Sequence, residues 1–352
     1  MDQKFPLGLS YDDVLLIPQY SEIDSRSEVD LSAKISPTLT LKIPLITAKM
    51  DTVTGIKMAI EIGKLGGMGI LPRFETIESQ ADKVKQVAET RVVTAAAVGV
   101  KDGFEERAIA LVKAGATVLD IDVAHGHMKK TIEATKKLKS IFGNKITLIS
   151  GITSTYECAK DLYAAGADCL LVGVGAGSTC ITRVMTGFGV PMITALLETA
   201  KAAKKTGKTF APDAGIRNSG DIVKALATGA SAILGGNVFS GTDETPGKII
   251  MKNGIRYKEY NGSASMQEKA KQVQKDSSDK NENYIKQIEG VEGYVIYKGP
   301  VKDVVEKLLA VVRSGLSYAG ARNIPELWRK AKFIQITQNG LKENGAHDLI
   351  VR

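Results

Sequence analysis

The residues best suited to chemistry lie in segment 173–183, GVGAGSTCITR, which directly follows a short apolar run. Its three glycines, at positions 173, 175 and 177, let the backbone approach a ligand closely and turn amides or carbonyls toward an ion. Cys180 stands in this polar loop with Arg183 close by in sequence, a setting that favours the reactive thiolate. Burial as a small hydrophobe is the commoner fate of a cysteine, and we accept it for Cys158 and Cys169. We expect Cys180 to be a nucleophile.

A second polar segment, 211–225 (APDAGIRNSGDIVKA), again joins an expected strand to an expected helix. Asp213 lies at the end of that strand, where its carboxylate can accept two hydrogen bonds from the vicinal diol of a ribose. The next expected strand ends in GGN at 235–237, whose amides suit a phosphate beside the preceding loop. Glycines that only form turns would explain the loop at 213–218 or the loop at 235–237 taken alone. A role in turns explains the occurrence of both loops less well than a phosphate site does.

The segment DVAHGH (122–127) contains the two histidines His125 and His127. Two histidines two residues apart in a loop, with no third ligand nearby, make a poor metal site. Asp122, at the end of an expected strand, is the better candidate for a contact with the ribose or nicotinamide of a cofactor.

Short continuous apolar runs recur along the chain, as expected for parallel strands covered on both faces. Amphipathic segments such as 104–115 and 155–167 lie between them, each closed by a glycine. A strand–helix unit repeated eight times predicts an α/β fold of the (β/α)₈-barrel type. The expected strands are 44–48, 68–72, 93–99, 117–123, 146–150, 169–175, 209–214 and 231–236.

Two long intervals interrupt this repeat: one follows the sixth strand, and the other separates the eighth strand from closing helices expected at 301–314 and 324–332. The second contains the polar run 261–287, which is either disordered or a mobile lid. Its place at the catalytic end of the barrel favours a lid, or flap, covering about 260–295. We therefore expect a single catalytic domain over 1–352, with the closing helices lying within 301–333.

Composition limits the classes of function. The net charge is +8, but the lysines are scattered over expected helical faces; we expect attraction for phosphorylated small molecules and no nucleic-acid partner. We expect neither a signal peptide nor a membrane span, since no basic region precedes an apolar run and no run reaches about 18 apolar residues. Three cysteines without C-x-x-C spacing argue against a disulfide framework and favour a reducing cytoplasm.

At this point the residues resemble those of the IMP dehydrogenase and GMP reductase family, over nearly the whole chain and in the same order. The motifs that carry the resemblance are LSYDDVLLIPQYSEIDSRSEVDLSA near the start, ITAKMDTVTG (46–55), GGMGILPR (66–73), DVAHGH, GVGAGSTCITR, GIRNSGDIVKALATGA (215–230), GGNVFSGTDETPG (235–247) and EGVEGYVIYKG (289–299).

The resemblance implies a covalent bond between Cys180 and C2 of the purine of a nucleoside monophosphate, with Thr182 as a proton-relay hydroxyl and Glu289 near the N1–C2 edge. Asp122 and Val123 match the position that contacts a nicotinamide cofactor, NADPH/NADP or alternatively NAD. Backbone carbonyls of Gly175, Gly177 and Cys180 are similar to a monovalent-cation (K⁺) site, and the family suggests a homotetramer. The implied substrate-binding residues are Met50 against the base, Asp213 at the ribose, Ser178, Gly215, Gly236 and Tyr260 around the 5′-phosphate, and also Gly235 and Gly262.

The two enzymes of the family, the dehydrogenase and the reductase, catalyse different reactions that pass through the same covalent purine–cysteine adduct. Dehydrogenases usually carry an Arg-Tyr pair on the flap as the base for water, whereas Lys280 and Asn281 stand at the aligned position here. Val123 and the absence of a tandem regulatory domain between residues 90 and 95 also resemble the reductases. We therefore expect a GMP reductase, with an IMP dehydrogenase as the alternative.

The chain also departs from both family patterns, at Lys49, Pro72, Gly151 and Ala176. These departures leave open an altered paralogue that binds nucleotides without redox activity. A flavin-dependent barrel oxidoreductase would share the phosphate loops, but it would not need a cysteine after the sixth strand.

Overall fold

The computed structural model describes residues 5–275 and 282–345. Eight parallel strands form one sheet, in the order β10-β9-β8-β7-β6-β5-β4-β11. A parallel bridge between Asp213 and Leu234 joins the two end strands and closes the sheet into a barrel. Each strand agrees with one of the eight expected segments, so the predicted α/β barrel is confirmed. The strands are β4 (Leu45–Thr47), β5 (Met68–Leu71), β6 (Thr94–Val98), β7 (Val118–Ile121), β8 (Thr147–Thr153), β9 (Cys169–Val172), β10 (Thr209–Pro212) and β11 (Ile233–Gly235).

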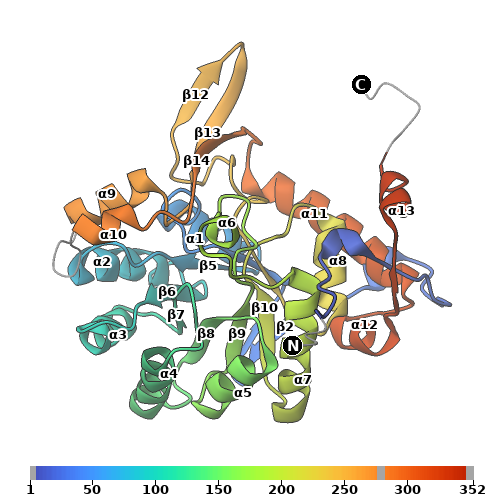
Figure 1. Cartoon of the computed structure of the whole chain (residues 1–352), viewed down its shortest axis with the longest axis horizontal. Helices are drawn as coiled ribbons and strands as arrows, with labels where there is room; N and C mark the ends of the chain where they lie inside the picture. The colour runs from blue at the N-terminus through green and yellow to red at the C-terminus, as the bar shows by residue number, and fades with distance from the viewer. Residues whose placement is uncertain (1–4, 276–281, 346–352) are drawn as a thin grey trace.

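A helix follows every barrel strand and packs on the outside of the sheet (Figure 1). Local sequence sets the helix ends: the side chain of Thr155 caps the helix after β8 by accepting from the Cys158 amide, and Gly166, at φ 112°, follows its last turn. The outer helices are α1 (Ile56–Lys64), α2 (Ile77–Ala88), α3 (Phe104–Lys113), α4 (Lys129–Phe142), α5 (Tyr156–Ala164), α7 (Met192–Thr206), α8 (Ser219–Ala227) and α11 (Val301–Tyr318).

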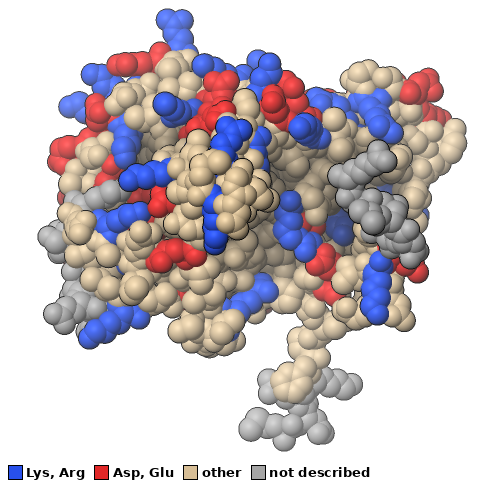
Figure 2. All heavy atoms as spheres, turned by 90° about the horizontal axis from the view of Figure 1, so that it is seen from above, with Lys and Arg blue, Asp and Glu red and all other residues tan. Residues whose placement is uncertain are grey.

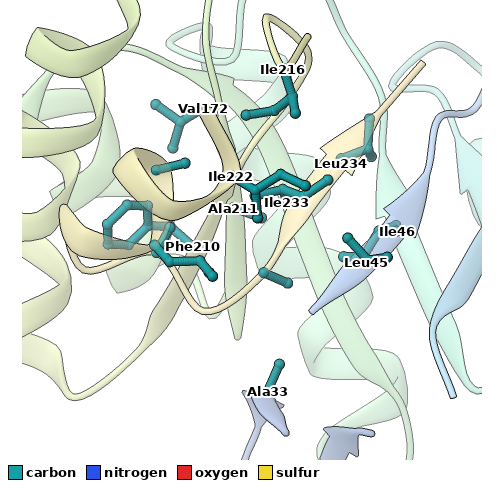
Figure 3. Close-up of a cluster of buried hydrophobic side chains, with 14 of the residues drawn as sticks. Ala33, Leu45, Ile46, Val172, Phe210, Ala211, Ile216, Ile222, Ile233 and Leu234 are labelled. Carbon is teal, nitrogen blue, oxygen red and sulfur yellow. The ribbon is translucent and has the colours of Figure 1, made fainter. Parts of the chain in front are cut away.

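The core lies inside the barrel and between the strands and helices. Figure 3 shows part of it, where side chains from β4, β10 and β11 meet Ile222 of α8. The hairpin of β2 (Ala33–Ser36) and β3 (Leu39–Leu41) covers the amino-terminal end of the barrel, with Ile35 fully buried. Two small elements, β1 (Val14–Leu16) and β15 (Phe333–Gln335), pair antiparallel and join the chain ends. The remaining terminal helices are α12 (Ile324–Lys330) and α13 (Gln338–Lys342).

The segment inserted after β11 is built from regular structure. It forms an antiparallel sheet of β12 (Ile249–Lys252), β13 (Ile255–Asn261) and β14 (Glu292–Ile296), with α9 (Met266–Lys275) and α10 (Glu282–Lys286) between the last two strands. In Figure 1 the sheet projects beyond the barrel, and α9 and α10 lie over α2. The helices expected at 301–314 and 324–332 are confirmed as α11 and α12. Lys280 and Asn281, expected at the position of the water-activating pair, lie outside the described residues.

Basic and acidic side chains are interspersed on the face shown in Figure 2, and the lysines and arginines do not form a single basic surface there. Among the described residues, no helix is long and apolar enough to cross a membrane.

Candidate active site

The loop between β9 and α6 (Thr182–Thr186) is fixed to the inserted segment by backbone hydrogen bonds. The Ile181 amide donates to the Glu289 carbonyl at 2.9 Å, and the Val291 amide donates to the Thr179 carbonyl at 2.9 Å. An antiparallel bridge joins Cys180 to Gly290. The inserted segment therefore brings residues more than 100 positions away in sequence against Cys180.

Three side chains form a continuous hydrogen-bonded chain at this junction. The Sγ atom of Cys180 lies 3.1 Å from Oγ1 of Thr182, and the Thr182 hydroxyl donates to Oε2 of Glu289 at 2.7 Å. With its hydroxyl proton directed at Glu289, Thr182 can accept a proton from the thiol through its free lone pair. The three side chains are partly exposed, so a ligand in the loop can reach the sulfur.

Arg183 does not have the role expected from its place in the sequence. Its guanidinium donates to the backbone carbonyls of Val174, at 3.3 Å, and of Val190, at 2.7 Å. These bonds fix the two ends of the long loop, and the polar neighbour of the Cys180 sulfur is the hydroxyl of Thr182.

A small cavity lies beside the loop, where the ends of β10 and β11 meet the inserted segment. At its edge, Ser178 donates to the hydroxyl of Tyr260 at 3.3 Å, and burial raises the pKa of that phenol. A side chain at Gly236 would lie 2.8 Å from the Tyr260 hydroxyl and 3.3 Å from Sδ of Met50, so glycine keeps this space open. Gly215 adopts φ 79°. The cavity is lined by Ala176, Ser178, Ala214, Gly215, Ile216, Arg217, Gly236, Asn237 and Tyr260.

Asp213, at the end of β10, accepts a hydrogen bond from Nζ of Lys49 at 3.0 Å. The same ammonium lies 3.0 Å from Oδ2 of Asp120 and 3.6 Å from Oδ1 of Asp122. Burial alone would lower the pKa of Lys49, but the three carboxylates together raise it above its usual value. Lys49 is therefore a fixed positive charge below the loops.

Asp122 lies on the side of the cluster away from Asp213. Nε of Arg73 donates to its Oδ2 at 3.1 Å, and 18% of the Asp122 side chain is exposed. Tyr284 of α10 is electrostatically coupled to both Arg73 and Asp122, and burial raises its pKa. The inserted segment thus lies close to Asp122 and Arg73 as well as to Cys180.

Three sequence candidates, and also His127, for which no metal site was expected, lie outside these groups. Gly235 ends β11 and packs against Val238 and Phe239, and it is not among the residues that line the cavity. Gly262 packs against Thr179, and it is not among the residues that line the cavity. The carbonyl of Val123 accepts from the Ile152 amide at 3.3 Å. Nε2 of His127 lies 3.0 Å from Oδ2 of Asp161.

Sequence reasoning missed the importance of Lys49, Asp120 and Arg73. Lys49 was noted only as a departure from the family pattern, Arg73 only as part of the motif GGMGILPR (66–73), and no role was expected for Asp120. The alternation DID at 120–122 was the available signal, because a strand that places Asp122 at its end places Asp120 on the same face, one layer deeper in the barrel.

Comparison with known proteins identifies the family of the chain. Residues 8–347 match the model of the IMP dehydrogenase / GMP reductase domain. The chain belongs to the IMP dehydrogenase and GMP reductase family. Inosine-5′-monophosphate dehydrogenase from Nitrosopumilus maritimus (strain SCM1) is 34% identical, covering 99% of this chain and 100% of that protein. GMP reductase from Leishmania major is 32% identical, covering 98% and 97% respectively.

Among solved structures, a cysteine-to-alanine variant of GMP reductase from Trypanosoma brucei, in complex with guanosine 5′-monophosphate, has a TM-score of 0.91 and 29% sequence identity. The match covers 98% of this chain and 99% of that one. This chain is therefore an NAD(P)-dependent oxidoreductase of purine nucleotide metabolism. The alignment with the Nitrosopumilus dehydrogenase spans 477 residues, more than the 352 of this chain, so that relative has residues with no counterpart here.

Proposed function

We propose that this protein is a GMP reductase that converts GMP and NADPH into IMP, ammonia and NADP through a covalent bond between Cys180 and C2 of the purine. The hydrogen bonds that link Cys180, Thr182 and Glu289 support the covalent step, which both reactions of the family share, and the sequence of the inserted segment favours the reductase. These three side chains provide a nucleophile and a route for its proton. No arginine lies between Arg256 and Arg313 to act as the base for water.

The substrate is held by three groups of residues. The cavity beside Ser178 and Tyr260 receives the 5′-phosphate, with backbone amides near Gly215 and Gly236 as donors. Asp213 accepts hydrogen bonds from the ribose diol through Oδ1, since Lys49 donates to its Oδ2. Met50 lies between this cavity and the barrel interior, where it packs against the purine. Gly262 supports the loop that carries Cys180.

The residues handle protons as follows. Cys180 transfers its proton through Thr182 to Glu289, and the sulfur forms a bond to C2. The proton then returns from Glu289 to the 2-amino group, which leaves as ammonia while the carbon–sulfur bond is kept. When C2 has been reduced, that bond breaks, the sulfur leaves as thiolate, and IMP is released. One further proton from solvent restores the thiol. General acid–base catalysis of this kind typically contributes about 10²- to 10⁴-fold in rate.

The residues around Asp122 fit a nicotinamide cofactor, which supplies the two electrons and the hydrogen that reduce C2. A partly exposed carboxylate beside Arg73 can accept hydrogen bonds from a ribose diol or a carboxamide. Asp122 and Arg73 would bind the cofactor, the backbone at Val123 would border it, and Tyr284 would help to exclude water from the space above them.

A dehydrogenase must bring an activated water to the same adduct, and for this it needs a base. A lysine such as Lys280 is a weak base at neutral pH, because its amine is protonated unless its pKa is lowered. The absence of arginine from 257–312 therefore favours loss of ammonia over attack by water.

IMP dehydrogenase is the second candidate, favoured by the 34% identity to the Nitrosopumilus dehydrogenase. That reaction would pass through the same adduct and would need a further group to activate water, for which Lys280 is the first candidate. The same three side chains would serve, so the two reactions must be separated by assay.

Three further features belong to the proposal. The loop fits a monovalent cation in donor chemistry, since it offers uncharged carbonyl oxygens at Gly175, Gly177 and Cys180; the cation would order the loop that carries the thiol. We propose a homotetramer, on the resemblance alone. We also propose a cytoplasmic location, because the three cysteines are free thiols and two of them, Cys158 and Cys169, are buried.

The test is the absorbance at about 340 nm, where reduced nicotinamide absorbs, in two reactions with purified protein. One contains GMP and NADPH; the other contains IMP, NAD and potassium chloride. Loss of NADPH with GMP, accompanied by ammonia, is the expected result. Production of NADH from IMP alone would establish the dehydrogenase instead, and Lys280 would be the first residue to mutate. No change in either reaction, with nucleotide binding intact, would indicate the altered paralogue.

A further inference from the structure

Lys49 lies where the two ligand subsites meet. It follows β4, and its ammonium reaches Asp120 on β7 and Asp213 after β10. Other strands separate β4, β7 and β10 from one another in the barrel, so these contacts run across its interior. Only 7% of Lys49 is exposed. The side chain is therefore buried between strands β4, β7 and β10.

Asp120 explains why a cation is required at this point. Its side chain is fully buried, and neither carboxylate oxygen has a hydrogen-bond donor aligned with it among the described residues. Among the described residues, the ammonium of Lys49, 3.0 Å from Oδ2 of Asp120, offsets the charge of this carboxylate. Burial raises the pKa of Asp120 to about 6 despite this neighbour, which shows how unfavourable the site is for an unpaired carboxylate.

The same ammonium also contacts the carboxylate on each side of the site. Asp213 faces Lys49 and the buried hydroxyl of Tyr260, whereas Asp122 faces Lys49, Arg73 and Tyr284. One positive charge is therefore shared by the group proposed for the ribose of the mononucleotide and the group proposed for the cofactor. A change in the position or charge of Lys49 must alter both groups at once.

We propose that Lys49 is a positioning residue that holds Asp213 for the nucleotide and Asp122 for the cofactor, so that one side chain supports both subsites. The inference rests on the proposed roles of those two aspartates. Without the ammonium, Asp120, Asp122 and Asp213 repel one another across the barrel, and the ribose and cofactor contacts lose their geometry together. Substitution of a residue that positions a single subsite would weaken the binding of one ligand only.

The experiment compares Lys49→Met and Lys49→Arg with the wild type by isothermal titration of GMP and, separately, of NADPH. Methionine keeps the length of the side chain and removes its charge, whereas arginine keeps the charge. We expect K49M to weaken binding of both ligands by about 10- to 100-fold, the range for loss of a buried hydrogen bond to a charged group. K49R should recover part of both losses.

Lys208→Met is the matched control. Lys208 is half-buried at the start of β10, the opposite end of the strand from Asp213, and it donates to the carbonyls of Tyr163 and Ala167 at 2.8 and 2.6 Å. Its replacement removes a partly buried lysine from the same barrel, and binding of both ligands should stay at the wild-type level.

The double variant K49M/D120N is the control for unfolding of K49M, because asparagine removes the buried charge that Lys49 offsets. It should unfold at a temperature near that of the wild type and still bind both ligands weakly. Full wild-type affinity for both ligands in the double variant would show that the contacts of Lys49 with Asp122 and Asp213 are not needed, and would overturn the inference.

Wild-type affinity for both ligands in K49M, or loss of affinity for only one, would also overturn the role of Lys49 while leaving the proposed function intact. Failure of the wild type to bind GMP or NADPH would instead overturn the roles of Asp213 and Asp122, and with them the proposed function.

Discussion

The substitution Glu289→Gln tests the proton relay with little change in shape. Glutamine retains an oxygen that can accept the hydrogen bond from the Thr182 hydroxyl, now 2.7 Å long. It also retains the backbone bond between the Ile181 amide and the carbonyl of residue 289. The loop that carries Cys180 should therefore keep its place, and the variant loses mainly the ability to take up and return a proton.

The expected loss follows from that single change. A positioned general acid or base contributes about 10²- to 10⁴-fold, which corresponds to about 3–5 kcal/mol in activation free energy. We expect kcat to fall by this factor, while the affinity for GMP changes by less than about threefold because Glu289 carries none of the proposed phosphate or ribose contacts.

The assay is steady-state oxidation of NADPH at saturating GMP, together with GMP titration calorimetry. Glu292→Gln is the control: Glu292 lies three residues further on, and it accepts from the Gln267 amide at 2.6 Å without contacting the relay. Equal rates for E289Q and E292Q would refute the relay. A loss of GMP affinity as large as the loss in kcat would show that Glu289 acts in binding.

Three further substitutions test other parts of the account. Cys180→Ala should abolish turnover and leave GMP binding largely intact; turnover above a few per cent of wild type would exclude covalent catalysis by this residue. Asp213→Ala should raise the KM for GMP by about 10- to 100-fold through loss of the ribose contacts, and an unchanged KM would remove that role. Asp120→Asn tests pH linkage: burial raises the pKa of Asp120 from 3.8 to about 6, so in this window the folded state holds a proton that the unfolded chain has released. The stability of the wild type relative to D120N should therefore fall as pH rises from about 4 to about 6, by about 1–3 kcal/mol in urea unfolding, and parallel pH profiles would contradict the shift.

The barrel could be predicted because each of its strands is a continuous apolar run that ends near glycine or a polar residue. These local signals give the order of the strands, and the rule that active sites lie at the carboxyl ends of barrel strands places the functional loops together. The loop that we propose to be reactive was selected in the same way, since its glycines and Cys180 follow β9 directly. The contact of Cys180 with Thr182 is local in sequence and agrees with the implied role.

The lysine cluster could not be predicted because its contacts cross the barrel between strands that are not neighbours. Nothing in the sequence near Lys49 indicates that its side chain turns inward to Asp120 and Asp213. A buried lysine is also rare unless it is paired, and its partners lie 71 and 164 positions further along the chain. Arg183 illustrates the opposite error: proximity in sequence suggested a contact with the thiol, whereas its side chain binds carbonyls at the two ends of the loop.

The inserted segment was only partly predictable. Its polar composition suggested disorder or a lid, since few large side chains remain to form a core. The structure shows that β13 and β14 pair along five residues of register, so backbone hydrogen bonds and contacts with the catalytic loop supply order that composition does not reveal. Its motion over the site remains a prediction.

The most direct test of the central claim follows the hydrogen that reaches the purine. Wild-type protein is incubated with GMP and NADPH that carries deuterium at C4 of the nicotinamide, each face of the ring being labelled in a separate sample. The nucleotide product is then analysed by mass spectrometry and proton NMR. The account predicts IMP that carries deuterium at C2 from one of the two labelled cofactors, together with ammonia. Recovery of unchanged GMP would contradict the account. Formation of XMP when the protein is given IMP, NAD and potassium chloride would also contradict it.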